Sequence, residues 1–566
     1  MIRRIFSRIL GNCCSWSALA AVAVVVFSVL PLVFILSSSR ELSFARWQSL
    51  WQSTVPELLL NTVKLAVLVT LFSVLLGVAA AWVVARFRFR GRQLLTWLLI
   101  IPLAIPTYVY ADIYTRLFGS QGWLGGVARV WQVHVVDSPW LTSVGVAWSK
   151  LTCALSRYTC DTSATSSFSE LLSASLVLSL ASFSYVFLLV RASLSKSTRS
   201  LEEAARIQGA DRKTLFRRIH LPMMRPAIAA SAALVVLHTV SDFGGVAMLQ
   251  YRTFTSVIYR RLDAEPGDLG WAAALSLVLV ALALTFLVVE RFFRQRQRYY
   301  TEGKDLDNDE LKELSGVPRV LVFVGMGVII LFAVLLPVAW LLVQSWIAIQ
   351  GSTLSQRFWS YAFNSFTIAT IAATLALVCA LPISLYHARR RNFLSASYVQ
   401  GASVGFVLPG PVVALGVSLV FVVLFHELGN TLLLFAWIIA VVVRYLPLAI
   451  QSQEAALQQF TPSIDQAARI LGAGTWERLT RVVLPIIRSG LIGAWVLVFI
   501  DALKELPAAL LFKAQGFDTL PIAIWKQADE EMMEEAAPAA LMLIVATLPA
   551  LWLMLHGNRS RGASAP

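Results

Sequence analysis

Long runs of apolar residues dominate the sequence, and twelve of them approach the length of a membrane span. A helix needs about 20 apolar residues to cross a bilayer. A shorter apolar stretch at 140–155 competes with the Ser-rich fourth run for that role. The predicted spans lie near residues 17–36, 59–84, 94–114, 168–190, 226–249, 269–289, 318–345, 362–386, 397–424, 431–450, 486–502 and 538–555. The runs predict an all-α polytopic membrane protein with about 12 transmembrane helices.

Composition agrees with a membrane protein and excludes several other classes. Hydrophobic residues make up 58% of the 566 residues and charged residues 14%, whereas soluble globular proteins carry about 25% charged residues. Disordered, collagen-like and disulfide-stapled secreted chains are therefore excluded. The five cysteines lack zinc-site spacing. Cys153 and Cys160, in a predicted external loop, either pair in an oxidising compartment or remain free thiols.

The basic residues predict the orientation of the chain. The net charge is +15, and loops on the cytoplasmic side carry an excess of Lys and Arg. With the N-terminus inside, 32 of the 47 basic residues fall in cytoplasmic segments. Both termini are then cytoplasmic, and the spans are expected to contact the lipid bilayer. Nucleic-acid binding is not expected, because no basic run has interleaved aromatic residues.

Short motifs occur twice along the chain at fixed offsets. After 303 residues, Asn61, Arg86 and Pro106 recur as Asn364, Arg389 and Pro409. After 263 residues, Ala204-Ala205-Arg206-Ile207-x-Gly209 and Leu221-Pro222 recur as Ala467-Ala468-Arg469-Ile470-x-Gly472 and Leu484-Pro485. The two offsets differ by 40 residues, so the first copy is expected to hold an external insert of that size near 115–165.

The duplication predicts two tandem repeats. Residues 1–300 form the first repeat and residues 301–566 the second, joined by a charged cytoplasmic linker at 291–317. Each repeat has six predicted spans. Because six is even, the two copies are expected to have the same orientation in the membrane, unlike the inverted repeats of many secondary transporters.

Each repeat carries the longer motif in a cytoplasmic loop. In the first loop the pattern is helical up to Gly209, which can adopt the positive φ that ends a helix. A short helix is predicted from Arg212 to Ile219, and Pro222 then begins the next span. The small side chains of Ala204 and Ala205 allow another protein to approach closely. The loop is therefore predicted to be a helix–turn–helix at the membrane surface.

The loop pattern resembles the signature of binding-protein-dependent ABC importer permeases, which is Glu-Ala-Ala, three residues, Gly, nine residues and Ile-x-Leu-Pro. The first copy matches throughout, with Glu203, Ala204, Ala205, Gly209, Ile219, Leu221 and Pro222. The second copy keeps Ala467, Ala468, Gly472, Leu484 and Pro485. It has Gln466 in place of the glutamate and Val482 in place of the isoleucine.

The resemblance implies that loops 201–222 and 464–485 each couple to one subunit of a homodimeric ABC ATPase. Gln466 lacks a carboxylate for a charge-assisted hydrogen bond, so the two docking sites are expected to differ. The chain has no G-x-x-x-x-G-K-[ST] motif. It is therefore predicted not to be an enzyme and to bind no cofactor, with ATP hydrolysed by the partner subunit.

Two further regions resemble one subgroup, the fused double-length ferric iron permeases. They are Ser241-Asp242-Phe243-Gly244-Gly245 with the stretch 252–260, and Lys504-Glu505-Leu506-Pro507-Ala508 with 516–525 and the acidic 529–535. The resemblance implies an importer for ferric iron, delivered by a periplasmic binding protein to external loops 115–165, 251–268 and 503–537. Thiamine, phosphonate and polyamine permeases share much of the pattern and remain alternative cargo classes.

The repeat also aligns four ionisable residues near the external ends of two spans. His238 and Asp242 align with Asp501 and Glu505, and each pair has the i, i+4 spacing of one helix face. These four residues are candidates for the outer mouth of a translocation path, where carboxylate oxygens suit a hard ferric ion. No tight metal site is predicted, since the cargo must be released. The alternative is that the residues cap the spans or pair with Lys504.

An ion-coupled secondary transporter is the second functional class. Such a protein needs charged residues deep in several spans. Here the deep parts of the predicted spans are apolar apart from Lys64 and Arg444. A secondary transporter would also not need the motif that occurs in both cytoplasmic loops. Uptake that persists without the ATPase would favour this class.

Overall fold

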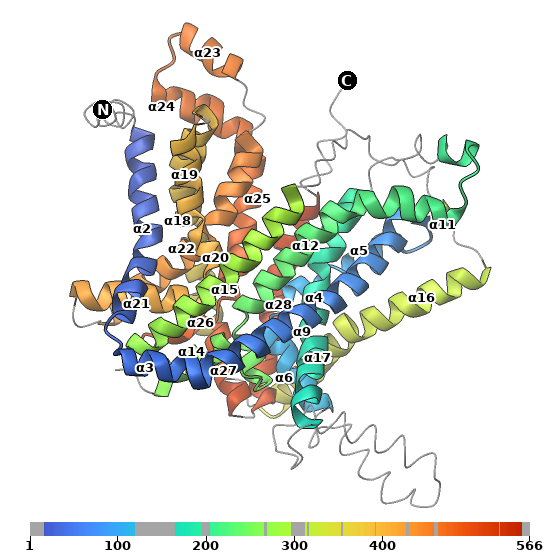
Figure 1. Ribbon diagram of the computed structural model, residues 1–566, viewed down its shortest axis with the longest axis horizontal. Helices are drawn as coiled ribbons and strands as arrows, with labels where there is room; N and C mark the ends of the chain where they lie inside the picture. The colour runs from blue at the N-terminus through green and yellow to red at the C-terminus, as the bar shows by residue number, and fades with distance from the viewer. Residues whose placement is uncertain are drawn as a thin grey trace, which may run out of the picture.

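The structure is a computed structural model and is almost entirely helical in the residues that it describes (Figure 1). These are residues 16–118, 165–194, 204–264, 269–295, 312–313, 316–352, 355–390, 392–425, 429–457, 462–530 and 532–556. The apolar stretch 140–155, most of the predicted insert, Cys153, Cys160 and Glu203 lie outside the described residues. Within them, the two short strands β1 (Phe87–Arg88) and β2 (Lys312–Glu313) pair in parallel.

The helices follow the two predicted halves. The first half contains α2 (Trp16–Ser39), α3 (Phe44–Ser49), η1 (Leu50–Thr54), α4 (Val55–Arg86), α5 (Arg92–Leu98), η2 (Ile101–Ala104), α6 (Thr107–Phe118), α9 (Thr165–Leu194), α11 (Arg212–Leu215), η3 (Phe216–His220), α12 (Leu221–Ser241), α13 (Gly244–Met248), α14 (Phe254–Ala264) and α15 (Leu269–Gln295). The second half contains α16 (Gly316–Ile330), η5 (Leu331–Leu335), α17 (Leu336–Gln350), α18 (Phe358–Arg389), α19 (Phe393–Ala402), α20 (Val404–Val407), α21 (Gly410–Phe425), α22 (Asn430–Leu457), α23 (Pro462–Ile470), α24 (Thr475–Arg478), η6 (Leu479–Val483), α25 (Leu484–Leu503), α26 (Pro507–Leu511), α27 (Leu520–Asp529) and α28 (Met533–His556).

Nearly all residues of the predicted apolar runs fall on helix, but three of the runs are not continuous spans. Among the described residues, nine helices are long and apolar enough to cross a membrane, or up to 11 if each bent pair counts as one span. The predicted span 94–114 bends by 96° between η2 and α6. The predicted span 226–249 is divided between α12 and α13, and the span 397–424 is divided into α19, α20 and α21. The expectation of about 12 transmembrane helices is therefore not confirmed.

One break in 94–114 and one break in 397–424 occur at the repeated prolines, Pro106 and Pro409. A proline disfavours helical dihedrals in the residue before it. Ile105, before Pro106, has φ −90° and ψ 119°. Leu408, before Pro409, has φ −75° and ψ 125°. The same local constraint thus breaks one apolar run in each half and starts a new helix, α6 or α21, directly after the proline.

The Ser-rich fourth run forms the buried helix α9. Its hydroxyl groups donate to backbone carbonyls: Ser175 to Leu171 (2.6 Å) and Ser184 to Leu99 (2.7 Å). A hydroxyl that is bonded in this way can be buried without an unsatisfied donor. Helix α4 packs closely along α9 at Gly77. Small and hydroxyl side chains at such an interface allow two membrane helices to approach closely.

The first span of each half packs against the other half. Helix α2 contacts α21 and α18, while α17 contacts α6. At the first contact, a Cβ added to Gly416 would lie only 2.7 Å from Cβ of Pro31, so a larger residue would clash there. At the second, the π-helical turn η5 offers backbone carbonyls to α6: Tyr110 donates to Ala333 (2.5 Å) and Tyr114 donates to Phe332. The first spans therefore contribute contacts between the two halves, although α17 also packs on α28 and α2 on α15, each in its own half.

The repeated asparagines have the same role in both halves. The side-chain amide of Asn61, on α4, donates to the carbonyl of Arg252 (3.2 Å). The amide of Asn364, on α18, donates to the carbonyl of Asp518 (2.9 Å). Each asparagine thereby fixes the loop that precedes α14 or α27. Matched contacts of this kind are what two copies of one unit would make; the six-span content of each copy remains a prediction.

Close packing of α4 on α9 predicts the effect of adding one methyl group. A Cβ at Gly77 would lie 2.5 Å from Cβ of Val186 and 2.8 Å from the carbonyl oxygen of Phe183. We expect Gly77→Ala to lower the free energy of unfolding by about 1–3 kcal/mol, because a tightly packed interface must separate. Thermal unfolding of the purified protein in detergent measures this. The matched control is Gly325→Ala on α16, where nothing lies within 4 Å, and equal losses in both variants would contradict the packing argument.

Candidate functional site: two surface loops and a charged cavity

The two motif loops lie at one edge of the molecule, α11 toward one end and α23 and α24 toward the other (Figure 1). Gly209 and Gly472 both have φ of 80°, the left-handed conformation predicted for Gly209. The N–H of Ala210 donates to the carbonyl of Ala205 (2.9 Å), and that of Ala473 donates to Ala468 (3.1 Å). Both helices therefore end in the same glycine-dependent turn.

A second short helix follows each glycine. In the first loop it comprises α11 and the π-helical turn η3, and in the second α24 and η6. The carboxylate of Asp211 accepts the N–H of Thr214 (2.9 Å) and caps α11. Hydrogen bonds from the side chain and backbone of Thr214 hold the pKa of Asp211 below its usual range. A π-helical turn occurs at the equivalent position of both halves, where the loop joins its span.

The motif residues divide between the loop surface and the span. Ala204, Gln466 and Ala467 are exposed, while Ala205 and Ala468 are half-buried. The Leu221-Pro222 and Leu484-Pro485 pairs begin α12 and α25, as predicted for the first loop. The structure therefore leaves the described part of the Glu-Ala-Ala motif available at the surface. It assigns the Leu-Pro pairs to the beginning of the next span.

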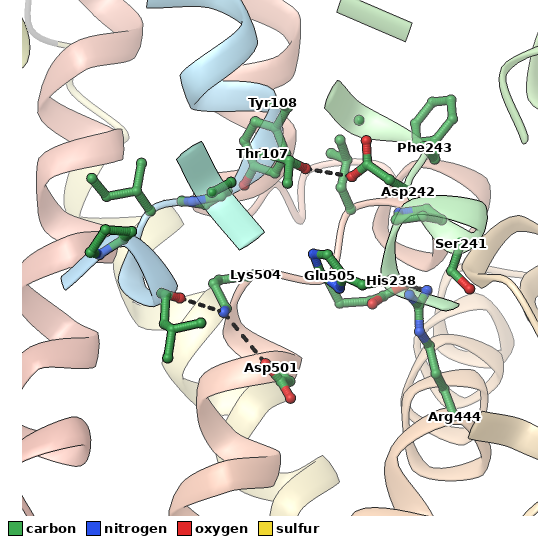
Figure 2. Close-up of a pocket in the computed structure, with 18 of the residues that line it drawn as sticks. Thr107, Tyr108, His238, Ser241, Asp242, Phe243, Arg444, Asp501, Lys504 and Glu505 are labelled. Atoms are coloured by element: carbon green, nitrogen blue, oxygen red, sulfur yellow. Dashed lines mark hydrogen bonds and ion pairs between the residues drawn. The ribbon is translucent and has the colours of Figure 1, made fainter. Parts of the chain in front are cut away.

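At the far ends of α12 and α25 lies a cavity of about 110 Å³ lined by both halves (Figure 2). The four candidate residues His238, Asp242, Asp501 and Glu505 all line it. The predicted helix-face pairing is wrong in detail. Helix α12 ends at Ser241 and α25 at Leu503, so Asp242 and Glu505 lie in the turns that follow. They reach the cavity because the chain turns back into α13 and α26.

The Asp242 carboxylate is held by neutral donors. One oxygen accepts the hydroxyl of Thr107 at the start of α6 (2.5 Å), as Figure 2 shows. The other oxygen accepts the backbone N–H of Val246 in α13 (3.1 Å). Gly245 makes room for this arrangement, because a Cβ there would lie 2.6 Å from that second oxygen. The Asp242 side chain thus has two neutral donors and no directly bonded cation among the described residues.

The equivalent carboxylate, Glu505, is held by a cation instead. Arg444 on α22 pairs with one oxygen (2.8 Å), and the hydroxyl of Tyr445 donates to the other (2.5 Å). Glu505 is only 4% exposed. Gly410, which aligns with Thr107, is required here: a Cβ on it would lie 1.7 Å from Nη1 of Arg444. The two halves therefore satisfy equivalent carboxylates by different chemistry.

Lys504 links the two halves across the cavity. Its ammonium group pairs with Asp501 (3.4 Å) and donates to the carbonyl of Leu103 in η2 (3.0 Å), as Figure 2 shows. The alternative expectation, pairing with Lys504, is thus confirmed for Asp501, whereas Glu505 pairs with Arg444. Asp501 and Lys504 come from the second half and Leu103 from the first. Relative movement of the halves would change this contact.

The cavity has a small excess of negative charge. Three carboxylates (Asp242, Asp501 and Glu505) face two cations (Arg444 and Lys504), which leaves one negative charge when His238 is neutral. Within the described residues, no group of three or more His, Cys, Asp or Glu is arranged to hold a metal ion. The arrangement suits brief contact with a cation, since every carboxylate already has a partner that an entering ion would have to displace.

Several residues that line this cavity were not assigned to it from the sequence, among them Thr107, Arg444 and Tyr445. Arg444 was visible as one of two charges deep in apolar runs, and such a charge normally has a buried partner. Its partner could not be identified, because Glu505 is 61 residues away in the chain. Nothing in a single sequence marks Thr107 or Tyr445 as a residue that lines a cavity.

The family described as "Binding-protein-dependent transport system inner membrane component" matches the chain twice, at residues 73–299 and 380–561. The chain is 28% identical to the "Fe(3+)-transport system permease protein FbpB 2" of Haemophilus influenzae, over 94% of this chain and 96% of that protein. It is 24% identical to the "Ferric transport system permease protein FbpB" of Actinobacillus pleuropneumoniae, over 81% and 65%. A "Probable sulfate transport system permease protein cysT" of Chlorokybus atmophyticus is 23% identical, over 48% and 86%.

The Arg444–Glu505 pair predicts a clear double-mutant result. Arg444→Met leaves the buried Glu505 carboxylate without its cation, and we expect a loss of about 3–5 kcal/mol in the free energy of unfolding. Combining it with Glu505→Gln removes the charge while retaining an acceptor for Tyr445. The double variant should therefore recover most of the loss in thermal unfolding. A double variant as unstable as Arg444→Met alone would show that the pair is not the source of the effect.

Proposed function

Because this chain belongs to the binding-protein-dependent inner membrane permeases, we propose that it is the transmembrane subunit of an ATP-driven importer for ferric iron. The observation that carries the cargo assignment is the extent of the similarity: a ferric transport permease aligns with nearly the whole chain, through both halves. The sulfate permease aligns with about half of it.

The charge of the cavity supports a cationic cargo. Ferric iron is a hard cation that favours oxygen ligands, and Asp242 presents carboxylate oxygens held only by neutral donors. The excess of one negative charge attracts a cation without holding it tightly. We propose that His238, Asp242, Asp501 and Glu505 belong to the translocation path, with Arg444 and Lys504 setting its net charge.

The proposed energy coupling follows two helical connections, of which the second is bent by 67°. The helical segment from Lys213 to Ser241 has 29 residues, about 43 Å at 1.5 Å per residue. It joins the first loop to the residue before Asp242. The bent segment from Trp476 to Leu503 connects the second loop to Lys504 in the same way. Closure of two ATPase subunits bound at the loops would therefore move the two sides of the cavity relative to each other.

The remaining partners and the orientation complete the proposal. The chain would hold no cofactor, with ATP hydrolysed by a homodimeric ATPase on the cytoplasmic side. A periplasmic binding protein would deliver cargo at the opposite edge, to the loops around α14 and α27. The protein would lie in the inner membrane with both termini cytoplasmic. These assignments are supported by the family, by the basic loops and by the position of both motif loops at one edge (Figure 1).

Docking through the loops predicts a specific effect of the two glycines. Valine disfavours positive φ, so Gly209→Val with Gly472→Val should unwind both turns. We expect the double variant to insert into the membrane but to lose co-purifying ATPase. The matched control is Gly474→Val, in the same loop but without a positive φ and with nothing within 4 Å of an added Cβ. Normal recovery of the ATPase with the double variant would refute loop docking.

The cargo assignment is tested by uptake of radiolabelled ferric iron in cells that express the permease, its ATPase and its binding protein. Uptake should require the permease and ATP. Asp242→Asn should lower the uptake rate by about tenfold, equivalent to ~1.4 kcal/mol, while the ATPase still co-purifies. Glu41→Gln, at an exposed position between α2 and α3, is the control.

Each other result of this experiment has a definite meaning. Absence of iron uptake while the ATPase co-purifies would overturn ferric iron as the cargo and redirect the assay to thiamine, phosphonates, polyamines and sulfate. Uptake that persists without the ATPase would replace the importer with an ion-coupled transporter. Uptake unchanged by Asp242→Asn would remove that carboxylate from the path.

A further inference from the structure

The two motif loops present different side chains at equivalent positions. Both expose an isoleucine at the end of the first helix, Ile207 and Ile470, each 86% exposed. The next position is Gln208 in the first loop and Leu471, 85% exposed, in the second. A few residues on, Lys213 in the first loop aligns with Trp476, 75% exposed, in the second.

The apolar group on the second loop is not explained by packing within the chain. Ile470, Leu471 and Trp476 are each at least 75% exposed. Burying a Leu or Ile side chain stabilises by roughly 1.5–3 kcal/mol, so three such groups left in water indicate a binding surface. Helices α23 and α24 project beyond the ends of α18 and α19 (Figure 1).

The first loop has charge where the second has apolar surface. Between residues 207 and 218 there are four basic residues and one acidic residue, and Lys213, Arg217 and Arg218 are exposed. The equivalent stretch 470–481 has two basic residues and one acidic. There, Arg481 pairs with Glu477 within the loop (2.6 Å). The second loop therefore offers little free charge beside its apolar group.

We propose that the two loops dock onto the ATPase by different interactions: the second loop through burial of Ile470, Leu471 and Trp476, and the first loop through Ile207 and the charges of Lys213, Arg217 and Arg218. This rests on the proposed function and specifies its partner. The matching groove on the ATPase has an apolar floor that accepts the isoleucine common to both loops. It also has acidic residues at its rim, facing the basic first loop.

Unequal docking has a consequence for a homodimeric ATPase. Its two grooves are identical, so any difference in affinity arises from the permease loops alone. A buried tryptophan and its neighbours supply most of the binding free energy at many protein interfaces, whereas exposed charge pairs are weakened by salt. The second loop is therefore the stronger and salt-insensitive contact. The first loop is the weaker, salt-sensitive one.

The test compares matched changes in the two loops of the full-length permease, purified in detergent and titrated with the ATPase at low and high salt. Leu471→Gln with Trp476→Lys gives the second loop the residues of the first. Lys213→Gln with Arg217→Gln removes charge from the first loop. The control is Phe393→Gln at the start of α19, an 87% exposed apolar residue outside both loops. Trp476→Ala alone is a milder variant in case the double change impairs folding.

We expect the second-loop variant and Trp476→Ala to weaken ATPase binding by about tenfold or more at both salt concentrations. The first-loop variant should weaken binding at low salt, where charges are least screened, and should flatten the salt dependence of binding. The control should bind normally. Equal losses for both loops, or a second-loop loss confined to low salt, would overturn the inference.

The experiment separates failure of this inference from failure of the proposed function. A wild-type chain that retains no ATPase would refute the importer assignment and the docking inference with it. Wild-type binding that is unchanged by Leu471→Gln with Trp476→Lys would overturn the inference alone. Unchanged binding accompanied by poorer recovery of the variant in membranes would assign Trp476 to the lipid headgroups, which equally overturns it.

Discussion

The need to satisfy every backbone hydrogen bond within the bilayer decides where this chain can leave a helix. In hydrocarbon, non-helical backbone is tolerated only where protein buries it or where it lines a polar cavity. The breaks at Pro106, after Ser241 and after Leu503 all contribute residues to one cavity. Helices that end inside the protein bring Thr107, Asp242 and Glu505 to its wall. The polar site thus occurs where the interrupted helices of both halves meet.

The two regions that match the family differ in the chemistry of their equivalent residues. The halves share broken spans, asparagine contacts to the loops and glycine-terminated surface loops. Within the cavity, however, Asp242 is bonded to a threonine hydroxyl, whereas Glu505 is paired with Arg444. The position of Arg444 in this pair depends on Gly410, because the Cβ of a larger residue would overlap the guanidinium group. A cavity of opposite charges with a small negative excess results, which two identical halves would not produce.

The same asymmetry extends to the loops. Both have the backbone that their shared motif requires, with a left-handed glycine and a π-helical turn before the span. Both expose an isoleucine, but beside it the first loop exposes basic side chains and the second a leucine and a tryptophan. Each loop continues into the span whose far end reaches the cavity. Under the proposed docking, a difference in how the loops bind the ATPase would become a difference in how the two sides of the cavity are moved.

The sequence by itself determined the helical membrane class, the duplicated motifs, the turns at Gly209 and Leu221-Pro222, and four ionisable residues that share one cavity. These features can be predicted because they depend on the composition and spacing of residues within a few helical turns of one another. Only the tertiary structure decided that three apolar runs are broken, that Asp242 and Glu505 lie beyond their helices, and that Glu505 pairs with Arg444. Such contacts join residues 61 to 135 positions apart, and the packing of helices that selects them leaves no periodic signal in one sequence.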